Sequence, residues 1–157
     1  MTKNRITAAM IILGWVLLFS GCNPGTVFQE SSPIPSENWH LEHVAGFEAS
    51  VSDTSSLHKL YLEVRNTTDY PYSNLYLFLD IEFPDGRILR DTIECMLAER
   101  SGRWTGKGFG RIKSNAFLFR DDVWFPEAGI YSFRIRHGMR EESLPGISDI
   151  GIRIDRK

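Results

Sequence analysis

The chain has 157 residues, of which 42% are hydrophobic and 24% are charged, and its formal net charge is -2. This composition excludes an intrinsically disordered chain, which would be less hydrophobic, and argues against a nucleic-acid-binding domain, which would carry an excess of lysine and arginine. The length fits one globular domain, and no internal repeat is visible.

Residues 1–21 are predicted to form an export signal. Lys3 and Arg5 give it a basic start, and the apolar run 8–19 is too short to span a bilayer. The signal ends at Cys22 in a segment that resembles the lipobox of bacterial lipoproteins, Leu18-Phe19-Ser20-Gly21-Cys22. In a lipobox the cysteine is acylated and becomes the mature N-terminus. The alternative is an ordinary secretory cleavage site beside an unrelated cysteine.

Membrane attachment is expected to come from the acyl chains on Cys22. Lys3 and Arg5 are lost with the signal, so acidic residues outnumber basic residues in the mature chain. Such a surface is not attracted to anionic headgroups, whereas several acyl chains on one cysteine make a lasting anchor.

Residues 22–38 are predicted to be the acylated cysteine and a flexible tether. The segment contains Pro24, Pro33 and Pro35 and shows no periodic placement of apolar residues. A tether of this kind would let a domain at 39–157 reach a partner above the membrane surface.

Beyond residue 38 the chain alternates between apolar and polar residues, which is typical of strands with one buried face. The alternating runs predict strands at about 39–50, 59–65, 75–83, 87–98, 110–112, 116–120, 130–136 and 150–154. Pro84-Asp85-Gly86 predicts a tight turn inside a hairpin. We therefore predict an all-β single domain at 39–157, an antiparallel β-sandwich of Ig-like or jelly-roll-like form, or a partly closed barrel.

Two local features support a sandwich. The segment 125–133 is similar to the corner that leads into a late strand of many sandwiches, where Gly129 would permit the turn and the Tyr131 hydroxyl would donate to a loop carbonyl. Cys95 shares a strand face with Ile93 and Leu97 and is predicted to be a small core residue. Once Cys22 is acylated, no disulfide can form within the chain.

No local motif predicts a catalytic, metal or cofactor site. His40 and His43 would point to opposite faces of a strand, and no second cluster of ligands accompanies them. The glycine-rich segment 102–110 lacks the spacing of a phosphate loop, and the serine-hydrolase motif Gly-x-Ser-x-Gly is absent. We predict a non-enzymatic protein without cofactor or metal, although a triad assembled only in three dimensions stays open. His58 and His137 are isolated, so surface or loop positions are expected.

The aromatic residues could fill the core or form a binding platform. A small domain buries its largest side chains first, so we expect core positions for Trp104, Trp124, Tyr70, Tyr72 and Phe109. An exposed platform built from them would instead favour carbohydrate binding.

A contact surface, if present, is expected in two loops. One loop contains Tyr70 and Tyr72, and the other contains Arg140 and Glu141. Loops with aromatic and arginine side chains anchor many protein interfaces. An exposed sheet edge is the other candidate.

The chain from about residue 39 to residue 154 resembles the gliding-motility lipoprotein H family of the Bacteroidetes. The resemblance rests on the runs 62–75, 91–92, 102–106, 129–133 and, most specifically, 139–152. We expect a binding protein that is anchored in the outer membrane and faces the periplasm. The resemblance implies a non-enzymatic lipoprotein of the envelope, needed for surface gliding in species that glide and linked to the gliding-motility and type IX secretion machinery. It implies no nucleic-acid partner and leaves a small-molecule ligand unspecified. The alternative is a carbohydrate-binding or surface-assembly lipoprotein of the same envelope.

Overall fold

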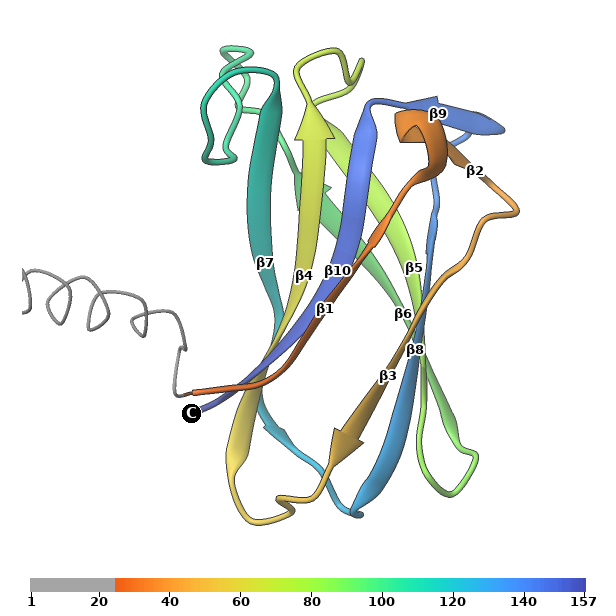
Figure 1. Cartoon of the computed structure of the whole chain (residues 1–157), viewed down its shortest axis with the longest axis vertical. Helices are drawn as coiled ribbons and strands as arrows, with labels where there is room; N and C mark the ends of the chain where they lie inside the picture. The colour runs from red at the N-terminus through yellow and green to blue at the C-terminus, as the bar shows by residue number, and fades with distance from the viewer. Residues whose placement is uncertain (1–24) are drawn as a thin grey trace, which may run out of the picture.

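The computed structural model describes residues 25–157, and most of them lie in strands (Figure 1). The strands are β1 (Thr26–Pro33), β2 (Asn38–His40), β3 (Ala45–Val51), β4 (Leu57–Thr67), β5 (Asn74–Glu82), β6 (Ile88–Met96), β7 (Ile112–Trp124), β8 (Gly129–His137), β9 (Ser143–Pro145) and β10 (Ile147–Arg156). A 3-10 turn, η2 (Pro35–Glu37), precedes β2. Across residues 25–157 no helix has the length and apolar character needed to span a bilayer. The predicted signal 1–21 and acylation site Cys22 lie outside the described residues.

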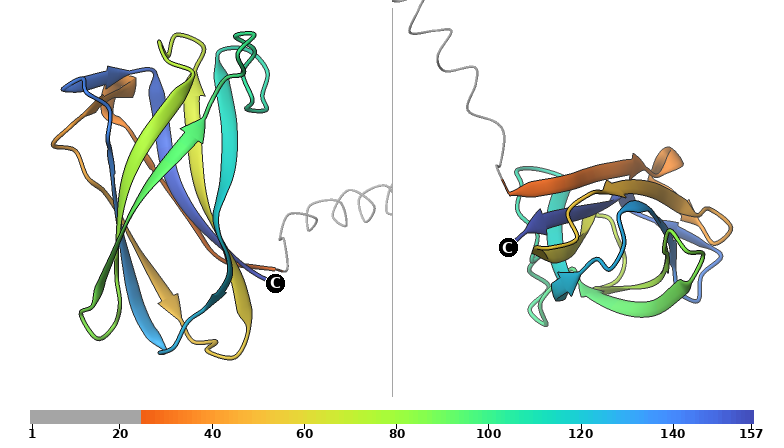
Figure 2. Two further views of the ribbon diagram at one scale, coloured as in Figure 1. Left: turned by 180° about the vertical axis from the view of Figure 1, so that it is seen from behind. Right: turned by 90° about the horizontal axis from the view of Figure 1, so that it is seen from below.

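Two four-stranded antiparallel sheets face each other (Figure 2). The first sheet has the order β1-β10-β4-β7 and the second the order β3-β8-β5-β6, while β2 and β9 form a short ribbon. The pairings are nested, because β5 pairs with β6, β4 with β7, β3 with β8 and β1 with β10. This nesting is the pattern of an eight-stranded jelly roll. The predicted all-β antiparallel sandwich is confirmed, in its jelly-roll form rather than its Ig-like form.

Residues 26–38, predicted as part of a flexible tether, belong to the folded domain. β1 pairs with β10 from Thr26 to Pro33, and the Gly25 carbonyl accepts a hydrogen bond from the amide of Arg156. Phe28 packs against the core, whereas most other β1 side chains face solvent. An edge strand with one buried large side chain leaves little alternation in the sequence, and Pro33 is tolerated because it ends an edge strand.

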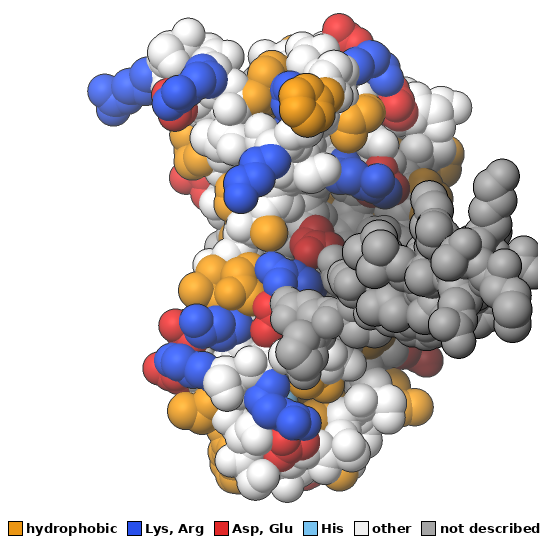
Figure 3. Space-filling model, turned by 60° about the vertical axis from the view of Figure 1, so that its left-hand side comes forward, with side chains coloured by type: hydrophobic (Ala, Val, Ile, Leu, Met, Phe, Trp, Pro, Cys, Tyr) orange, Lys and Arg blue, Asp and Glu red, His pale blue; other side chains and the backbone are white. Residues whose placement is uncertain are grey.

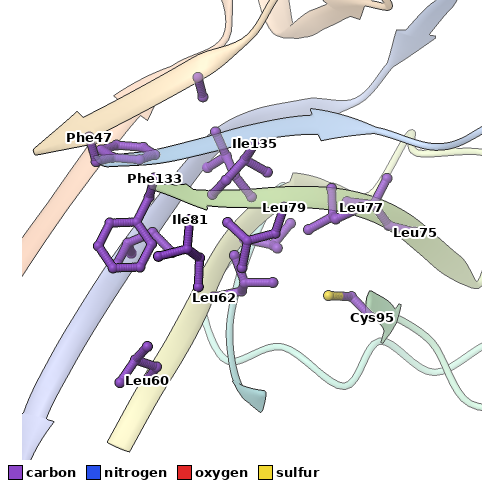
Figure 4. Packing of buried hydrophobic residues seen from close by; sticks show 14 of the residues in the cluster. Phe47, Leu60, Leu62, Leu75, Leu77, Leu79, Ile81, Cys95, Phe133 and Ile135 are labelled. Atoms are coloured by element: carbon purple, nitrogen blue, oxygen red, sulfur yellow. The ribbon is translucent and has the colours of Figure 1, made fainter. Parts of the chain in front are cut away.

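The core lies between the two sheets. In β5 every second side chain points inward, and these leucines meet inward-facing residues of β4 and β8 (Figure 4). Cys95 is buried at the side of this cluster, as its strand face predicts. Each fully buried Leu, Ile or Phe contributes roughly 1.5–3 kcal/mol to the stability of such a core.

The predicted turn and corner are both present. The Gly86 amide donates to the Phe83 carbonyl at 2.9 Å and closes the β5–β6 hairpin. The Tyr131 hydroxyl donates to the Glu127 carbonyl at 2.9 Å. Gly129 has a φ of 153° and lies so close to Pro84 that a Cβ would come within 2.8 Å of the proline ring.

Two histidines and two aromatic residues contradict their predicted positions. His58 and His137, expected at the surface, are fully buried because they lie on the inward faces of β4 and β8. Their rings meet Phe125 and Trp39 edge to face. The aromatic residues Trp124 and Phe109, expected in the core, are exposed.

Other predicted positions and strands agree more closely with the structure. Tyr70 is buried as expected, and Tyr72 and Trp104 are partly buried against the core. The two short strands predicted at 110–112 and 116–120 form one long strand, β7. The β9 segment was not predicted as a strand.

Candidate partner-binding groove

An aromatic groove lies on the outer face of the second sheet, near the end of the domain that holds the 68–73 and 138–142 loops. It has a volume of about 520 Å³. Its walls come from β5, β6 and the two loops, and its lining residues are Tyr72, Tyr76, Phe78, Thr92, Gly138, Met139, Arg140 and Glu141. We call this site the aromatic groove.

The floor of the aromatic groove follows from the alternation of β5. Because inward positions of this strand are leucines, Tyr76 and Phe78 project from the opposite face. They are 39% and 40% exposed, which is unusual for two large aromatic side chains on one strand face. The Gly138 amide donates to the Tyr76 carbonyl at 2.7 Å and fixes the second loop beside this floor.

One wall is closed by a hydrogen bond between the two predicted contact loops. The Tyr72 hydroxyl donates to Glu141 Oε1 at 2.6 Å. This bond raises the pKa of the Tyr72 hydroxyl and lowers the pKa of the Glu141 carboxyl, because it favours the neutral phenol and the charged carboxylate. Arg140 lies next to this pair in the wall.

Tyr70 does not reach the aromatic groove directly. Its ring is buried behind Tyr72, with the two ring centroids 5.7 Å apart in a T-shaped arrangement, and its hydroxyl donates to the Asn74 carbonyl at 2.9 Å. Burial raises the pKa of the Tyr70 hydroxyl well above its ordinary value. Of the four residues predicted for the contact surface, the structure brings Tyr72, Arg140 and Glu141 together and gives Tyr70 a supporting position.

Sequence reasoning missed Tyr76 and Phe78 but included Met139, which belongs to the predicted contact loop with Arg140 and Glu141. A signal for the first two was present, because they occupy the solvent-facing positions of a strand whose inward positions are already filled by leucines. Met139 packs partly against the core, and its sulfur lies 3.4 Å from the Tyr76 amide. Its place follows from the path of the 138–142 loop, which no periodic pattern predicts.

A charged strip continues from the aromatic groove along the same sheet face. Phe78 and Thr92 line both sites, and the strip adds Asp80, Arg90, Asp91 and Arg136. The Arg136 guanidinium lies 5.8 Å from the centre of the Phe78 ring, within the range of a cation–π contact. The combined surface can therefore contact an apolar group at one end and a charged or hydrogen-bonding group at the other.

A larger hollow of about 730 Å³ lies on the outer face of the first sheet. Three of its four charged lining residues already form ion pairs, since Arg65 bonds Asp149 at 2.5 Å and Glu63 bonds Arg153 beside the hollow at 3.0 Å; the fourth is Lys107. A ligand there would have to displace these contacts, and the one aromatic residue of its lining, Phe117, packs partly against the core. The aromatic groove is the stronger candidate for partner contact.

The described residues give no arrangement suited to a metal or to thiol chemistry. Within residues 25–157 no group of three or more His, Cys, Asp and Glu side chains lies close enough to hold a metal ion. Burial raises the pKa of the Cys95 thiol to about 12, so it is not ionised near neutral pH.

Comparison with known proteins gives the family. Residues 26–154 match the model of the GldH lipoprotein family. The chain belongs to this family. A gliding motility lipoprotein GldH homolog of Christiangramia forsetii is 33% identical over 95% of each chain, and the gliding motility lipoprotein GldH of Flavobacterium johnsoniae is 34% identical over 96% of each chain.

The GldH family match begins where β1 begins, which agrees with the folded state of this strand. Among solved structures, Pseudomonas aeruginosa AlgX is similar over 90% of this chain and 29% of its own, with 16% sequence identity and a TM-score of 0.40.

Proposed function

We propose that this GldH-family protein is anchored to the outer membrane by acyl chains on Cys22, faces the periplasm, and acts as a non-enzymatic binding component of the gliding-motility and type IX secretion machinery. The observation that carries the proposal is the similarity to two gliding-motility lipoproteins over nearly the whole chain. The lipobox-like segment that ends at Cys22 supports the anchor.

The aromatic groove supports the binding role. Aromatic, methionine and arginine side chains are enriched in protein interfaces, and here Tyr76, Phe78, Met139 and Arg140 line one recess. The Tyr72–Glu141 bond orders both loops before a partner arrives, which lowers the entropy cost of binding.

The anchor is tested by a Cys22→Ala variant expressed in the native host. Mass spectrometry of the mature N-terminus should find acyl chains on the unaltered protein, and the variant should leave the outer-membrane fraction. Protease added to intact cells should spare the anchored protein if it faces the periplasm. An unmodified Cys22 would refute the anchor, and digestion in intact cells would refute the periplasmic location.

The groove is tested by crosslinking in cells. A photo-crosslinking amino acid at position 76 should capture motility or type IX secretion proteins, whereas the same group at position 130 should not. Ile130 is a suitable control because it is exposed on the same sheet face, toward the opposite end of β8 from the groove. Equal capture from both positions would refute the groove as the binding site.

The aromatic groove is also the site of the second candidate function, carbohydrate binding. Two exposed rings on one strand face could stack on a sugar, with Thr92 available for hydrogen bonds. In that case Tyr76→Ala plus Phe78→Ala should abolish binding to envelope glycans in calorimetry, and crosslinking from position 76 should recover no protein. Absence of glycan binding across a broad panel would exclude this alternative.

A further inference from the structure

We propose that the domain rests directly on the bilayer that carries the lipid, and that Trp124 and Leu57 enter its headgroup region. The inference deepens the proposed function, since it rests on acylation of Cys22. It assigns a lipid surface to an exposed patch at the end of the first sheet, which we call the Trp124 patch. The patch consists of Leu57 and Trp124.

The distance between the anchor at Cys22 and the first sheet is short. The Gly25 carbonyl accepts a 2.7 Å hydrogen bond from the Arg156 amide, and Thr26 pairs with Asp155. Only two residues separate Cys22 from Gly25. Three residue steps span at most about 11 Å, so the sheet cannot stand far from the membrane.

The Trp124 patch lies at the same end of the first sheet as Gly25, the first described residue after the anchor. Along this end of the first sheet, Arg156 contacts Gly25, the Lys157 amide donates to the Leu57 carbonyl at 2.9 Å, and Leu57 pairs with Trp124. Neighbouring strands lie about 4.8 Å apart, so Trp124 is about 15 Å from Gly25. Figure 1 shows the C-terminus next to the first described residues at this side of the sheet.

The chemistry of the Trp124 patch suits a lipid headgroup region. The Trp124 side chain is 58% exposed and Leu57 is 44% exposed, and they are directly opposite on adjacent strands. The Trp124 indole N–H donates to the Thr54 carbonyl at 2.6 Å, which leaves the apolar edge of the ring for the solvent side. Tryptophan is enriched at the interface between lipid headgroups and hydrocarbon, where an amphipathic ring is stable.

Charge does not contribute a net attraction at this end. Lys157 pairs with Asp121 at 3.3 Å and also with Asp122, and Arg156 pairs with Asp53 at 3.1 Å. On the side that carries β7 and β4 in Figure 1, basic and acidic side chains are interspersed (Figure 3). The contact should therefore form equally well on neutral and anionic lipids, unlike that of a polybasic surface.

This placement turns the aromatic groove away from the membrane. The groove lies beside the loop that follows Thr67, whereas the Trp124 patch lies at Leu57, and these residues are the two ends of β4. A strand of this length spans about 35 Å. The partner would therefore bind on the membrane-distal side of the domain.

The test uses the full-length acylated protein in vesicles of phosphatidylethanolamine and phosphatidylglycerol that contain brominated acyl chains, which quench nearby tryptophans. Cleavage at Cys22 removes Trp15, Trp39 is fully buried, and Trp104 lies in the loop region at the other end of the domain. Quenching should therefore report Trp124 and should disappear in Trp124→Phe. The matched control adds Phe109→Trp to Trp124→Phe, because position 109 is fully exposed near the groove end.

The expected result is quenching of the unaltered protein, no quenching of either variant, and no change when phosphatidylglycerol is omitted. Co-flotation with vesicles without quenching would overturn the proposed contact while leaving the lipid anchor intact. Failure to co-float would refute the anchor and the contact together. Quenching at position 109 would overturn the orientation. Capture of a protein from position 124 in cells, without quenching in vesicles, would assign the patch to a protein partner and overturn the proposal.

Discussion

Replacing Gly146 with alanine should destabilise the domain through two separate effects. Gly146 has a φ of 91°, a conformation that costs an alanine about 1–2 kcal/mol. A Cβ at this position would also come within 2.7 Å of the Tyr70 Cα and 2.8 Å of the Tyr70 amide nitrogen. Both atoms belong to the Tyr70 backbone, so the backbone must move, which costs about 1–3 kcal/mol more.

The backbone around Gly146 cannot shift freely to relieve this contact. Its amide donates to the Glu37 carbonyl at 2.7 Å, and its carbonyl accepts from the Thr67 amide at 2.8 Å. We therefore expect Gly146→Ala to lower the free energy of unfolding by roughly 2–5 kcal/mol. Urea unfolding followed by circular dichroism measures this loss.

Gly86→Ala is the matched control. Gly86 has a similar φ of 84°, but no atom lies within 4 Å of an added Cβ. This variant should lose only the conformational part, about 1–2 kcal/mol. Equal losses in the two variants would refute the role of the close approach to Tyr70. Because Tyr70 supports Tyr72, crosslinking from position 76 should also decrease in Gly146→Ala but not in Gly86→Ala.

Three further changes follow from the structure. Tyr131→Phe removes the bond to the Glu127 carbonyl and should cost about 1 kcal/mol in urea unfolding; no loss would show that the bond does not stabilise the corner. Burial lowers the pKa of His137 below 6.5. Just below pH 6.5, therefore, the unfolded chain binds a proton at this residue more readily than the folded chain does. Stability should therefore fall as the pH drops from 6.5 toward the folded pKa, and His137→Phe should flatten this part of the profile. Deleting residues 26–33 behind an intact Cys22 should cost at least about 2 kcal/mol, because Phe28 and one edge of β10 become exposed; a flexible tether would predict no change.

Alternation predicted the parts of the fold that bury one side of a strand. The runs that became β4, β5, β8 and β10 each place large apolar residues at every second position. Alternation also predicts a buried position for His58, because this residue has the same parity as the inward-facing leucines of β4. Residue type alone predicts a surface or loop position for His58, and side-chain size alone predicts a core position for Trp124; the structure contradicts both.

Alternation could not predict features that depend on which strands, distant in sequence, pair with each other. β1 is recognisable as a strand only through its pairing with β10, since its own sequence shows little alternation. The choice of a jelly roll over an Ig-like order likewise depends on which strands pair, and periodicity carries no such information. The aromatic groove was predicted in part, because loop composition pointed to Tyr72, Arg140 and Glu141, but its floor required the structure of β5.

The nested pairing of the strands determines when the first sheet can form as the chain emerges. The first sheet has β10 at its centre, between β1 and β4, although β10 follows all the other described strands in the sequence. A chain that emerges N-terminus first, from a ribosome or a translocation channel, therefore cannot complete this sheet until β10 has emerged. The second sheet lacks β10, so its strands can pair earlier, and the core closes only when β10 adds its inward-facing isoleucines.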